Sequence, residues 1–197
     1  MISTQQRRLK RGFDLVLSLV LVPLALVPIL ILVVIATLDT KAWGVFTQKR
    51  IGQYGEPFNI YKIRTLRNET HLTGQLHQSA SGLGNFLRQS KLDELPQLLN
   101  VLKGDMGFVG PRPDIPGYAD MLQGADRTIL QIRPGITGPA TIKYKDEDKL
   151  LAKQENPQYY NDHVIWRDKV QINKYYIENW SFCLDLRIII KSLINWK

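Results

Sequence analysis

The chain has 197 residues, with 26 lysines and arginines, 18 aspartates and glutamates, and a formal net charge of +8. This length favours one domain with an appendage over two full domains. The single cysteine, Cys183, excludes an internal disulfide framework and a zinc site built from cysteines, and its apolar neighbours predict a buried filler residue. The basic balance is compatible with an anionic partner (nucleic acid, anionic lipid or a phosphorylated substrate), and equally with ordinary surface charge.

An apolar run, residues 15–38, contains no ionisable side chain. It exceeds the ~20 residues that a helix needs to cross a bilayer, and it is too long for the core of a cleavable signal peptide. Basic residues flank it on both sides, so both flanks favour the cytoplasmic side of a membrane. The flanking residues are Arg7, Arg8, Lys10 and Arg11 before the run, and Lys41, Lys49, Arg50, Lys62, Arg64 and Arg67 after it.

Two prolines, Pro23 and Pro28, lie near the middle of this run, where each removes a backbone hydrogen bond and bends a helix. A helix that enters the membrane, bends at proline and returns to the same face satisfies both basic flanks. We therefore expect a basic N-terminus and re-entrant membrane helix over residues 1–40, and a second part over 41–197. A straight span, which would place the two parts on opposite sides of the membrane, is the alternative.

Short elements follow the apolar run. Residues 45–48 and 58–64 predict two strands joined by a glycine-containing turn. The polar segment 68–82 has no apolar period and predicts a loop. Helical spacing of apolar residues begins at 83–87, and a second set, at i, i+3, i+4 and i+7 over 95–102, ends at a glycine.

The C-terminal half alternates stiff loops with helical patterns. Residues 104–117 and 133–139 are rich in Gly and Pro and predict shaped loops, whereas 118–131 and 146–178 predict helices. The tail, 180–196, mixes apolar, basic and tryptophan residues, which suits a helix at a membrane interface or one that packs on the core. The fold class is therefore α+β: a re-entrant membrane helix and a small helical domain with a short β-hairpin and interfacial amphipathic helices.

An acid pair, Asp93 and Glu94, follows Ser90, which fits a capping box and places both acids in a first helical turn. There the positive helix end would keep carboxylates ionised, and plain capping is one interpretation. The cations Arg88 and Arg112 on either side favour another, because a carboxylate near cations can attack a phosphoryl centre and form an acyl-phosphate. Mg²⁺ commonly binds through one or two carboxylates plus substrate phosphates, so this pair is also the candidate metal site.

Two proline-stiffened loops carry arginine. In Gly110–Pro113 the backbone is fixed on both sides of Arg112, which suits a guanidinium that holds phosphate, although a solvated surface turn is the plain alternative. Arg133-Pro134-Gly135 repeats the arrangement. The acidic run at residues 146–148 predicts a solvated charge cluster. No P-loop or dinucleotide fingerprint is present, and His71, His77 and His163 show no metal-ligand spacing.

Seven motifs stand in order along nearly the whole chain. In this order they resemble the bacterial sugar transferase family, the small monotopic polyprenyl-phosphate phosphoglycosyl transferases. The motifs are Lys10-Arg11-x-Phe13-Asp14, Val45–Gly52, Tyr61–Thr65, Ser90–Gln97, Asn100–Met106, Gly110–Pro113 and Arg133–Gly138.

The resemblance implies a monotopic enzyme at the cytoplasmic face of the bacterial inner membrane. It would move a sugar-1-phosphate from a nucleotide diphosphate sugar, usually a UDP-sugar, to undecaprenyl phosphate with Mg²⁺, the first membrane step of surface glycan synthesis. Carried onto this chain, Asp93 is the nucleophile, UMP leaves, and the lipid phosphate attacks the phosphosugar–Asp93 intermediate. Glu94 would bind magnesium or handle the acceptor proton. The cations expected on substrate phosphate are Lys62, Arg88, Arg112 and Arg133.

The expected partners are the nucleotide sugar, undecaprenyl phosphate and membrane lipids, with no nucleic acid and no further membrane bundle ahead of Lys10. The chain departs from the family pattern at Val22-Pro23 and Val27-Pro28, where Ser-Pro is common, at Asn173, where many members carry Asp, and over 137–145. Two other functions stay open: a non-enzymatic membrane-anchored module that binds polyanions, and a metal-dependent phosphohydrolase. The sugar, the nucleotide, the glycan pathway and the oligomeric state are also open.

Overall fold

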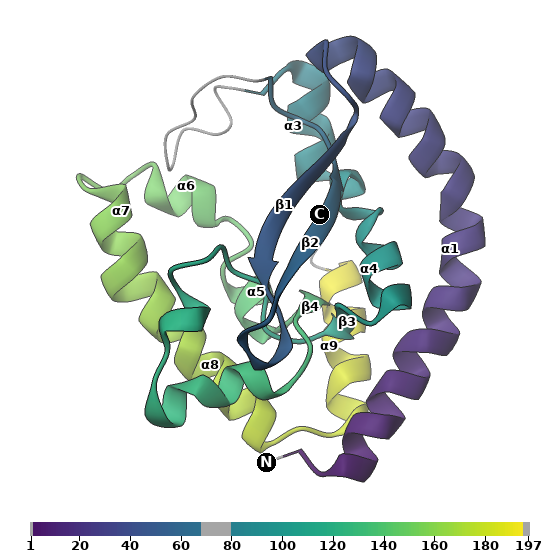
Figure 1. Ribbon diagram of the computed structural model, residues 1–197. Helices are drawn as coiled ribbons and strands as arrows, with labels where there is room; N and C mark the ends of the chain where they lie inside the picture. Colours follow the sequence, from purple (N-terminus) through teal and green to yellow (C-terminus); the bar gives the residue numbers. More distant parts are fainter. Residues whose placement is uncertain (1, 68–79, 195–197) are drawn as a thin grey trace.

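A computed structural model describes residues 2–67 and 80–194 of the chain. The predicted loop at 68–82, and with it His71 and His77, therefore lies mostly outside the described residues. Figure 1 shows one long helix, α1 (Thr4–Thr40), which follows one side of the molecule from end to end while the other elements lie on its concave side. The structure mixes helices with two small sheets, which agrees with the predicted α+β class.

Helix α1 has clear end signals. The Ser3 hydroxyl accepts a hydrogen bond from the Gln6 backbone, the Gln6 side chain accepts one from the Ser3 backbone, and Lys41 ends the helix in the left-handed conformation. Both Pro23 and Pro28 lie inside the assigned helix, which curves without ending at either. By length and composition, α1 is the one helix of the described residues that is apolar enough to cross a membrane.

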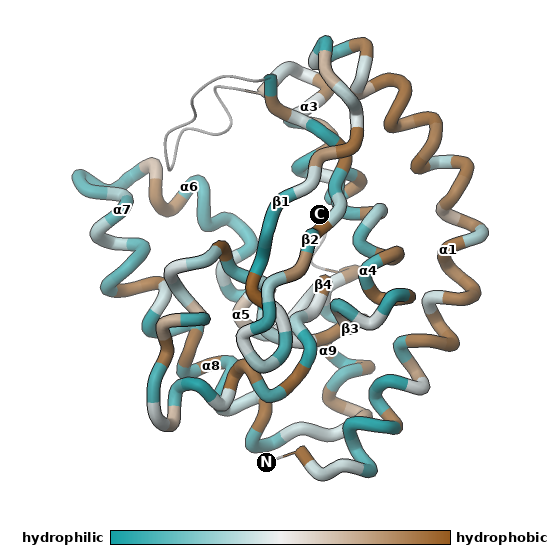
Figure 2. The backbone as a smooth tube through the Cα atoms, in the orientation of Figure 1, coloured by the Kyte–Doolittle hydropathy of each residue, from teal (hydrophilic) through white to brown (hydrophobic). Residues whose placement is uncertain are grey.

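Helix α1 contacts the globular part of the molecule near both of its ends, and Figure 2 shows that most of the helix beyond its N-terminal turns is hydrophobic. In the first half, Lys10 pairs with Asp185 at 2.5 Å and Asp14 accepts from the backbone of Phe108. In the second half, Ile29, Val33 and Ala36 pack with Ile63 and Leu87. The two ends of the apolar segment are thus anchored on the same globular part. Large apolar side chains that stay exposed on α1 include Val16, Leu24, Val27, Ile31 and Leu38.

The predicted hairpin is confirmed. Strands β1 (Val45–Ile51) and β2 (Pro57–Ile63) pair antiparallel, and the short turn η1 (Gln53–Gly55) joins them. Helix α4 (Gln97–Lys103) is tied to β2 by Asn100, which accepts from the Tyr61 backbone and donates to the carbonyl of Asn59.

A second, parallel sheet occupies the segments for which loops were expected. Strand β3 (Gly107–Val109) pairs with β4 (Gly135–Thr137). The backbones approach so closely that a Cβ on Gly135 would overlap the backbone nitrogen of Gly110. The helix expected over 118–131 is also wrong in type, because that stretch forms two 3₁₀ segments, η3 (Ala119–Met121) and η4 (Gly124–Gln131).

The other helices surround these sheets. They are α3 (Gly82–Gln89), α5 (Pro139–Lys143), α6 (Glu147–Leu151), α7 (Pro157–Tyr160), α8 (Trp166–Glu178) and α9 (Phe182–Ile194), with a π-helical turn, η5 (Asn161–Ile165), between α7 and α8. On α9, Asp185 and Ile188 are buried while Leu193 and Ile194 are exposed, so the tail helix packs on the core and also carries an outward apolar face. Cys183 is exposed, so its prediction as a buried filler is wrong.

Candidate active site

The acid pair sits in a tight turn between two helices. Helix α3 ends at Ser90, the chain reverses at Lys91 with φ of 55°, and Asp93 and Glu94 occupy the 3₁₀ turn η2 (Leu92–Glu94). The Ser90 hydroxyl donates to the carbonyl of Phe86, at the end of α3. The predicted capping box is therefore wrong, because Ser90 closes the preceding helix instead of opening the next.

Glu94 is the charge-compensated member of the pair. Its Oε1 accepts from Lys62 Nζ at 3.1 Å and from Arg112 Nη2 at 2.7 Å. Burial raises the pKa of Glu94, but the charges of Arg112 and Lys62 outweigh burial and hold that pKa well below its ordinary value. Strand β2 supplies Lys62, and the Gly110–Pro113 loop supplies Arg112. The structure thus brings together three residues that the sequence analysis selected.

Asp93 has the opposite environment. Its side chain is buried, with 5% of the residue exposed, and Oδ1 has no hydrogen-bond partner among the described residues. Burial raises the pKa of the Asp93 carboxyl, and Lys62 is the strongest charge that opposes this. We expected a helix end to keep both carboxylates ionised; instead, two cations stabilise Glu94 and burial disfavours the charge on Asp93.

The acidic run that precedes and begins α6 closes another side of the site. Asp148 pairs with Arg88 at 3.0 Å, and Glu147 pairs with Lys169 at 2.7 Å. Of the run, only Asp146 pairs in an exposed setting, with Lys149. The prediction of a solvated cluster is therefore wrong for Asp148 and Glu147, since both are partly buried and paired with cations, and one of these cations, Arg88, also acts on the charge of Asp93.

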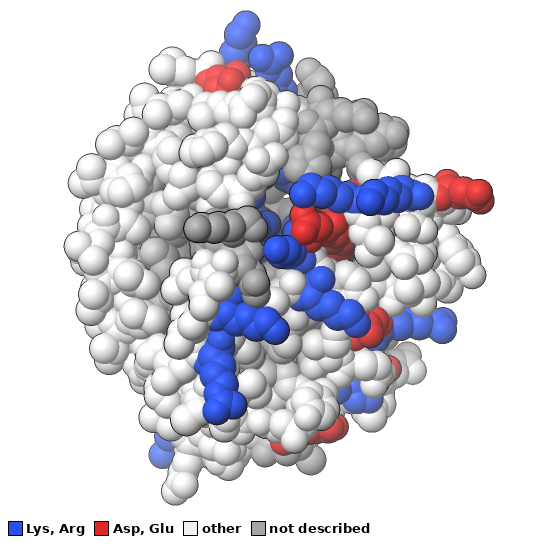
Figure 3. Space-filling view, turned by 180° about the vertical axis from the view of Figure 1, so that it is seen from behind, with Lys and Arg blue, Asp and Glu red and all other residues white. Residues whose placement is uncertain are grey.

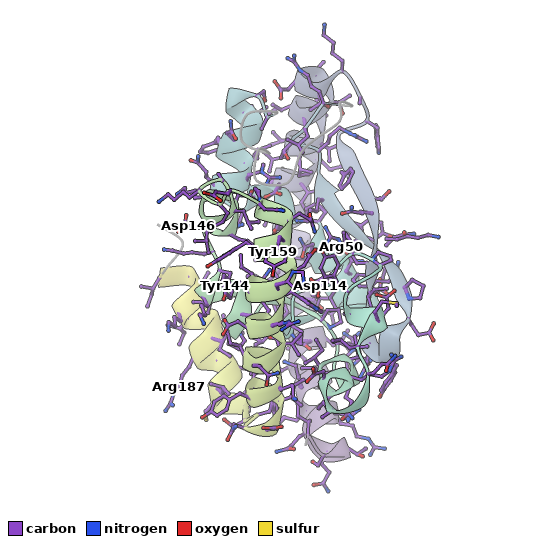
Figure 4. All side chains as sticks on the ribbon, turned by 90° about the vertical axis from the view of Figure 1, so that its left-hand side faces the viewer. Arg50, Asp114, Tyr144, Asp146, Tyr159 and Arg187 are labelled. Atoms are coloured by element: carbon purple, nitrogen blue, oxygen red, sulfur yellow. The ribbon has the colours of Figure 1, made fainter. Side chains whose placement is uncertain are left out.

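Arg50 and Asp114 were missed as site residues. Arg50 donates to the carbonyl of Pro113, and burial together with the charge of Arg112 lowers its pKa to about 10. Burial raises the pKa of Asp114 to about 6, against the charges of Lys169 and Arg50. Figure 4 shows Arg50 and Asp114 on the same side of the α7–α8 helix. The sequence contained a signal for both residues, because Arg50 lies inside the Val45–Gly52 motif and Asp114 directly follows the Gly110–Pro113 motif.

Cations and acids lie together on the rear face of the molecule (Figure 3). Figure 3 shows Lys and Arg side chains around acidic ones near the middle of the rear face, while the side formed by α1 is uncharged over most of its length. The charged site and the apolar helix are therefore neighbouring parts of one surface.

A family model for bacterial sugar transferases matches residues 5–196. The chain belongs to the bacterial sugar transferase family. It is 35% identical over 184 residues to the Bacillus subtilis protein named uncharacterized sugar transferase EpsL. This match covers 92% of this chain and 83% of that protein. The resemblance found in the sequence is thereby confirmed.

Two relatives with named activities are longer than this chain. The Escherichia coli UDP-glucose:undecaprenyl-phosphate glucose-1-phosphate transferase is 32% identical, and the match covers 98% of this chain and 41% of that protein. The Aeromonas hydrophila UDP-N-acetylgalactosamine-undecaprenyl-phosphate N-acetylgalactosaminephosphotransferase is also 32% identical, with 94% and 43% covered. The chain thus spans less than half the length of these two enzymes.

Unpartnered buried polar atoms are concentrated in the candidate site. Six such side-chain atoms occur among the described residues, and four belong to Arg50, Arg88, Asp93 and Gln97. Because buried polar atoms are normally hydrogen-bonded, such a concentration indicates where a polar ligand completes the structure. Gln97 is the further residue that the sequence analysis did not select, although it ends the motif that contains Asp93.

Arg133 lies elsewhere. Its Nε donates to the carbonyl of Gly104 at the C-terminal end of α4, where Arg11 also binds the helix carbonyls. Asp93 and Glu94 precede the other end of this helix, about 10 Å away for seven residues at 1.5 Å each. The structure does not bring Arg133 to the acid pair, and its role on phosphate stays a prediction.

Proposed function

We propose that this chain is a phosphoglycosyl transferase that moves a sugar-1-phosphate from a UDP-sugar to undecaprenyl phosphate through a phosphosugar–Asp93 intermediate. The named relatives use donors and an acceptor of these classes. The observation that carries the proposal is the contrast within the acid pair: Asp93 keeps a buried, unpartnered oxygen, while the adjacent Glu94 is bound by two cations. An oxygen without a partner is free to attack.

The proposed steps balance without a base. An Asp93 oxygen attacks the phosphorus that bears the sugar, the bond from that phosphorus to the leaving UMP oxygen breaks, and the electron pair leaves with UMP. The undecaprenyl phosphate oxygen then attacks the same phosphorus, which releases Asp93 as carboxylate and forms the lipid diphosphate sugar. Since Glu94 is held ionised by Lys62 and Arg112, it suits the role of a fixed anion better than that of a proton donor.

Mg²⁺ fits the residues present. No group of three or more His, Cys, Asp or Glu side chains that could hold a metal occurs in the described part of the chain, so a complete protein cage is not the expected form. Among the residues that the structure describes, Asp93 Oδ1 has no hydrogen-bond partner, and Lys62 and Arg112 both bind the same Glu94 oxygen, Oε1. Asp93 and Glu94 would hold the ion together with substrate phosphates, and the ion would neutralise phosphate charge.

We further propose that α1 is re-entrant, so that the enzyme is monotopic on the cytoplasmic face of the inner membrane. The support is that both ends of α1 contact the same globular part, through Lys10 with Asp185 and through Val33 and Ala36. A straight span would separate these contacts by the bilayer. Cysteine probes placed before residue 10 and near residue 45, in a Cys183→Ser background because Cys183 is exposed, should both resist an external impermeant thiol reagent. Labelling of only the second probe would mean a spanning helix.

The enzymatic proposal is tested by UMP release. The wild type, offered a panel of UDP-sugars with undecaprenyl phosphate and Mg²⁺, should release UMP and form lipid diphosphate sugar, and EDTA should stop both. Asp93→Asn should abolish release, provided that mass spectrometry excludes deamidation back to Asp. Sustained turnover by that variant would refute the nucleophile.

The same assay separates the alternatives. A phosphohydrolase would yield free sugar phosphate with or without the lipid acceptor. A polyanion-binding module would show salt-sensitive binding that does not depend on Asp93. Against the module stands the finding that Lys62 and Arg112 bind Glu94 and that Arg88 binds Asp148, so these cations are engaged within the site.

A further inference from the structure

Gln97, four residues after the proposed nucleophile, is buried with a side-chain donor that has no hydrogen-bond partner among the described residues. It is the first residue of α4, it is 1% exposed, and its Nε2 has no hydrogen-bond partner among the described residues. A primary amide nitrogen carries two N–H donors and accepts nothing. Burying such a donor without a partner destabilises a protein, so its presence calls for an explanation.

The local backbone places Gln97 one turn after Asp93. Asp93 lies in η2, and the next residues, Leu95 and Pro96, both have right-handed helical angles, so the path from Asp93 to Gln97 is helical. The backbone bonds of this path, from Leu95 to Leu92 and from Leu98 to Leu95, join residues three apart, so four residues advance the chain by about 6–8 Å, roughly one turn. A buried acceptor, Asp93 Oδ1, and a buried donor, Gln97 Nε2, therefore lie about one turn apart on one helical segment, and neither has a hydrogen-bond partner in the described structure.

The Gln97 amide is a neutral donor, unlike the lysine and arginine side chains of the site. Lys62 and Arg112 bind Glu94, and Arg88 binds Asp148, so each of these cations already has an acidic partner. Three buried donors, Arg50 Nε, Arg88 Nε and Gln97 Nε2, have no hydrogen-bond partner among the described residues, and Gln97 is the only neutral one of these three. Preorganised donors of this kind are the most effective in stabilising charge that develops during a reaction.

We propose that Gln97 is a further catalytic residue, whose amide donates to a non-bridging oxygen of the phosphoryl group as that group is transferred to Asp93. This inference rests on the proposed function. In the step, the bond from an Asp93 oxygen to phosphorus forms while the bond from phosphorus to the UMP oxygen breaks. The non-bridging oxygens carry the charge throughout, and no proton moves. Gln97 would recognise the transferred phosphate and not the nucleotide.

The test separates catalysis from folding. Gln97→Met keeps the length of the side chain and removes the donor, so it should not lower the melting temperature, because no bond of the free enzyme is lost. With a UDP-sugar and without lipid acceptor, rapid-quench measurement should show formation of the radiolabelled phosphosugar–protein adduct slowed roughly 10- to 100-fold, the range for one lost hydrogen bond to a charged group. Gln97→Glu, which places an acceptor there, should slow it at least as much.

Asn173→Leu is the matched control, because Asn173 on α8 is also buried with an unpartnered amide atom, here Oδ1. It should leave the rate of adduct formation near that of the wild type. If Gln97→Met forms the adduct at the wild-type rate, the proposed role of Gln97 is overturned and the proposed function still stands. A melting temperature lowered by Gln97→Met, with the rate reduced only by the unfolded fraction, would show a purely structural residue. Failure of the wild type to form any adduct with any UDP-sugar would overturn the proposed function itself.

Discussion

Replacing Glu94 by glutamine should destabilise the fold, although the shape of the side chain is kept. The substitution turns two charge-assisted hydrogen bonds into bonds to a neutral acceptor, and each such change costs about 1–1.5 kcal/mol. The Lys62 side chain is 17% exposed and bears the full cost, whereas that of Arg112 is 37% exposed and water recovers roughly half of it. The expected loss of unfolding free energy is therefore about 2 kcal/mol, most of it from the charge left on Lys62.

Urea unfolding in one detergent, followed by tryptophan fluorescence, measures this loss. Asp146→Asn is the control, since it removes an exposed pair with Lys149 on the same side of the site and should leave the midpoint unchanged. The loss from Glu94→Gln should shrink at high pH, because burial already lowers the pKa of Lys62 and Glu94 is the main charge that raises it. Equal midpoints for the two variants at pH 7 would refute the charge compensation of Glu94.

Three other perturbations test other parts of the site and fold. Lys62→Met removes the strongest charge that lowers the pKa of Asp93, so the acid limb of the pH–rate profile for UMP release should move to higher pH, and an unmoved limb would contradict the pairing. Because folding raises the pKa of Asp93, stability falls as pH rises through that pKa; Asp93→Asn should therefore raise the melting temperature at pH 7 by a few degrees, and a decrease would count against the burial argument. Asp148→Asn frees Arg88 and should lower the KM for the UDP-sugar up to roughly 5-fold, the upper end of the range of a single ion pair in a partly exposed setting. An unchanged KM would mean that Arg88 does not bind the donor.

The sequence predicted those parts of the fold that depend on local pattern. The β1–β2 hairpin followed from two apolar strands around a turn, and α1 from an uninterrupted apolar run. The β3–β4 pair could not be read, because it joins segments far apart in the chain and depends on glycines that let two backbones meet. Glycine and proline there suggested loops, since local pattern does not report long-range pairing.

The site divides in the same way. The order of motifs along the chain was enough to predict Asp93, Glu94, Lys62 and Arg112 as site residues. The fold brings these four residues together. Burial and partners were not readable, and they decide the chemistry. From the sequence, Asp93 and Glu94 share one expected environment, a helix end, because no local pattern reveals that β2 and the Gly110–Pro113 loop both direct their cations to Glu94.

The two adjacent carboxylates, Asp93 and Glu94, have different surroundings, which suits them to different roles. Paired acids whose surroundings push their pKa values apart can take different roles, as in other enzymes with two carboxylates. Here Lys62 and Arg112 both pair with Glu94, and their charges keep its carboxylate ionised inside the site. Among the described residues, one oxygen of the buried Asp93 carboxyl has no hydrogen-bond partner, a destabilising state that a bound substrate or metal would relieve. A fold that satisfied Asp93 as fully as Glu94 would be more stable, and it would lack the unbound oxygen that the proposed attack on phosphorus requires.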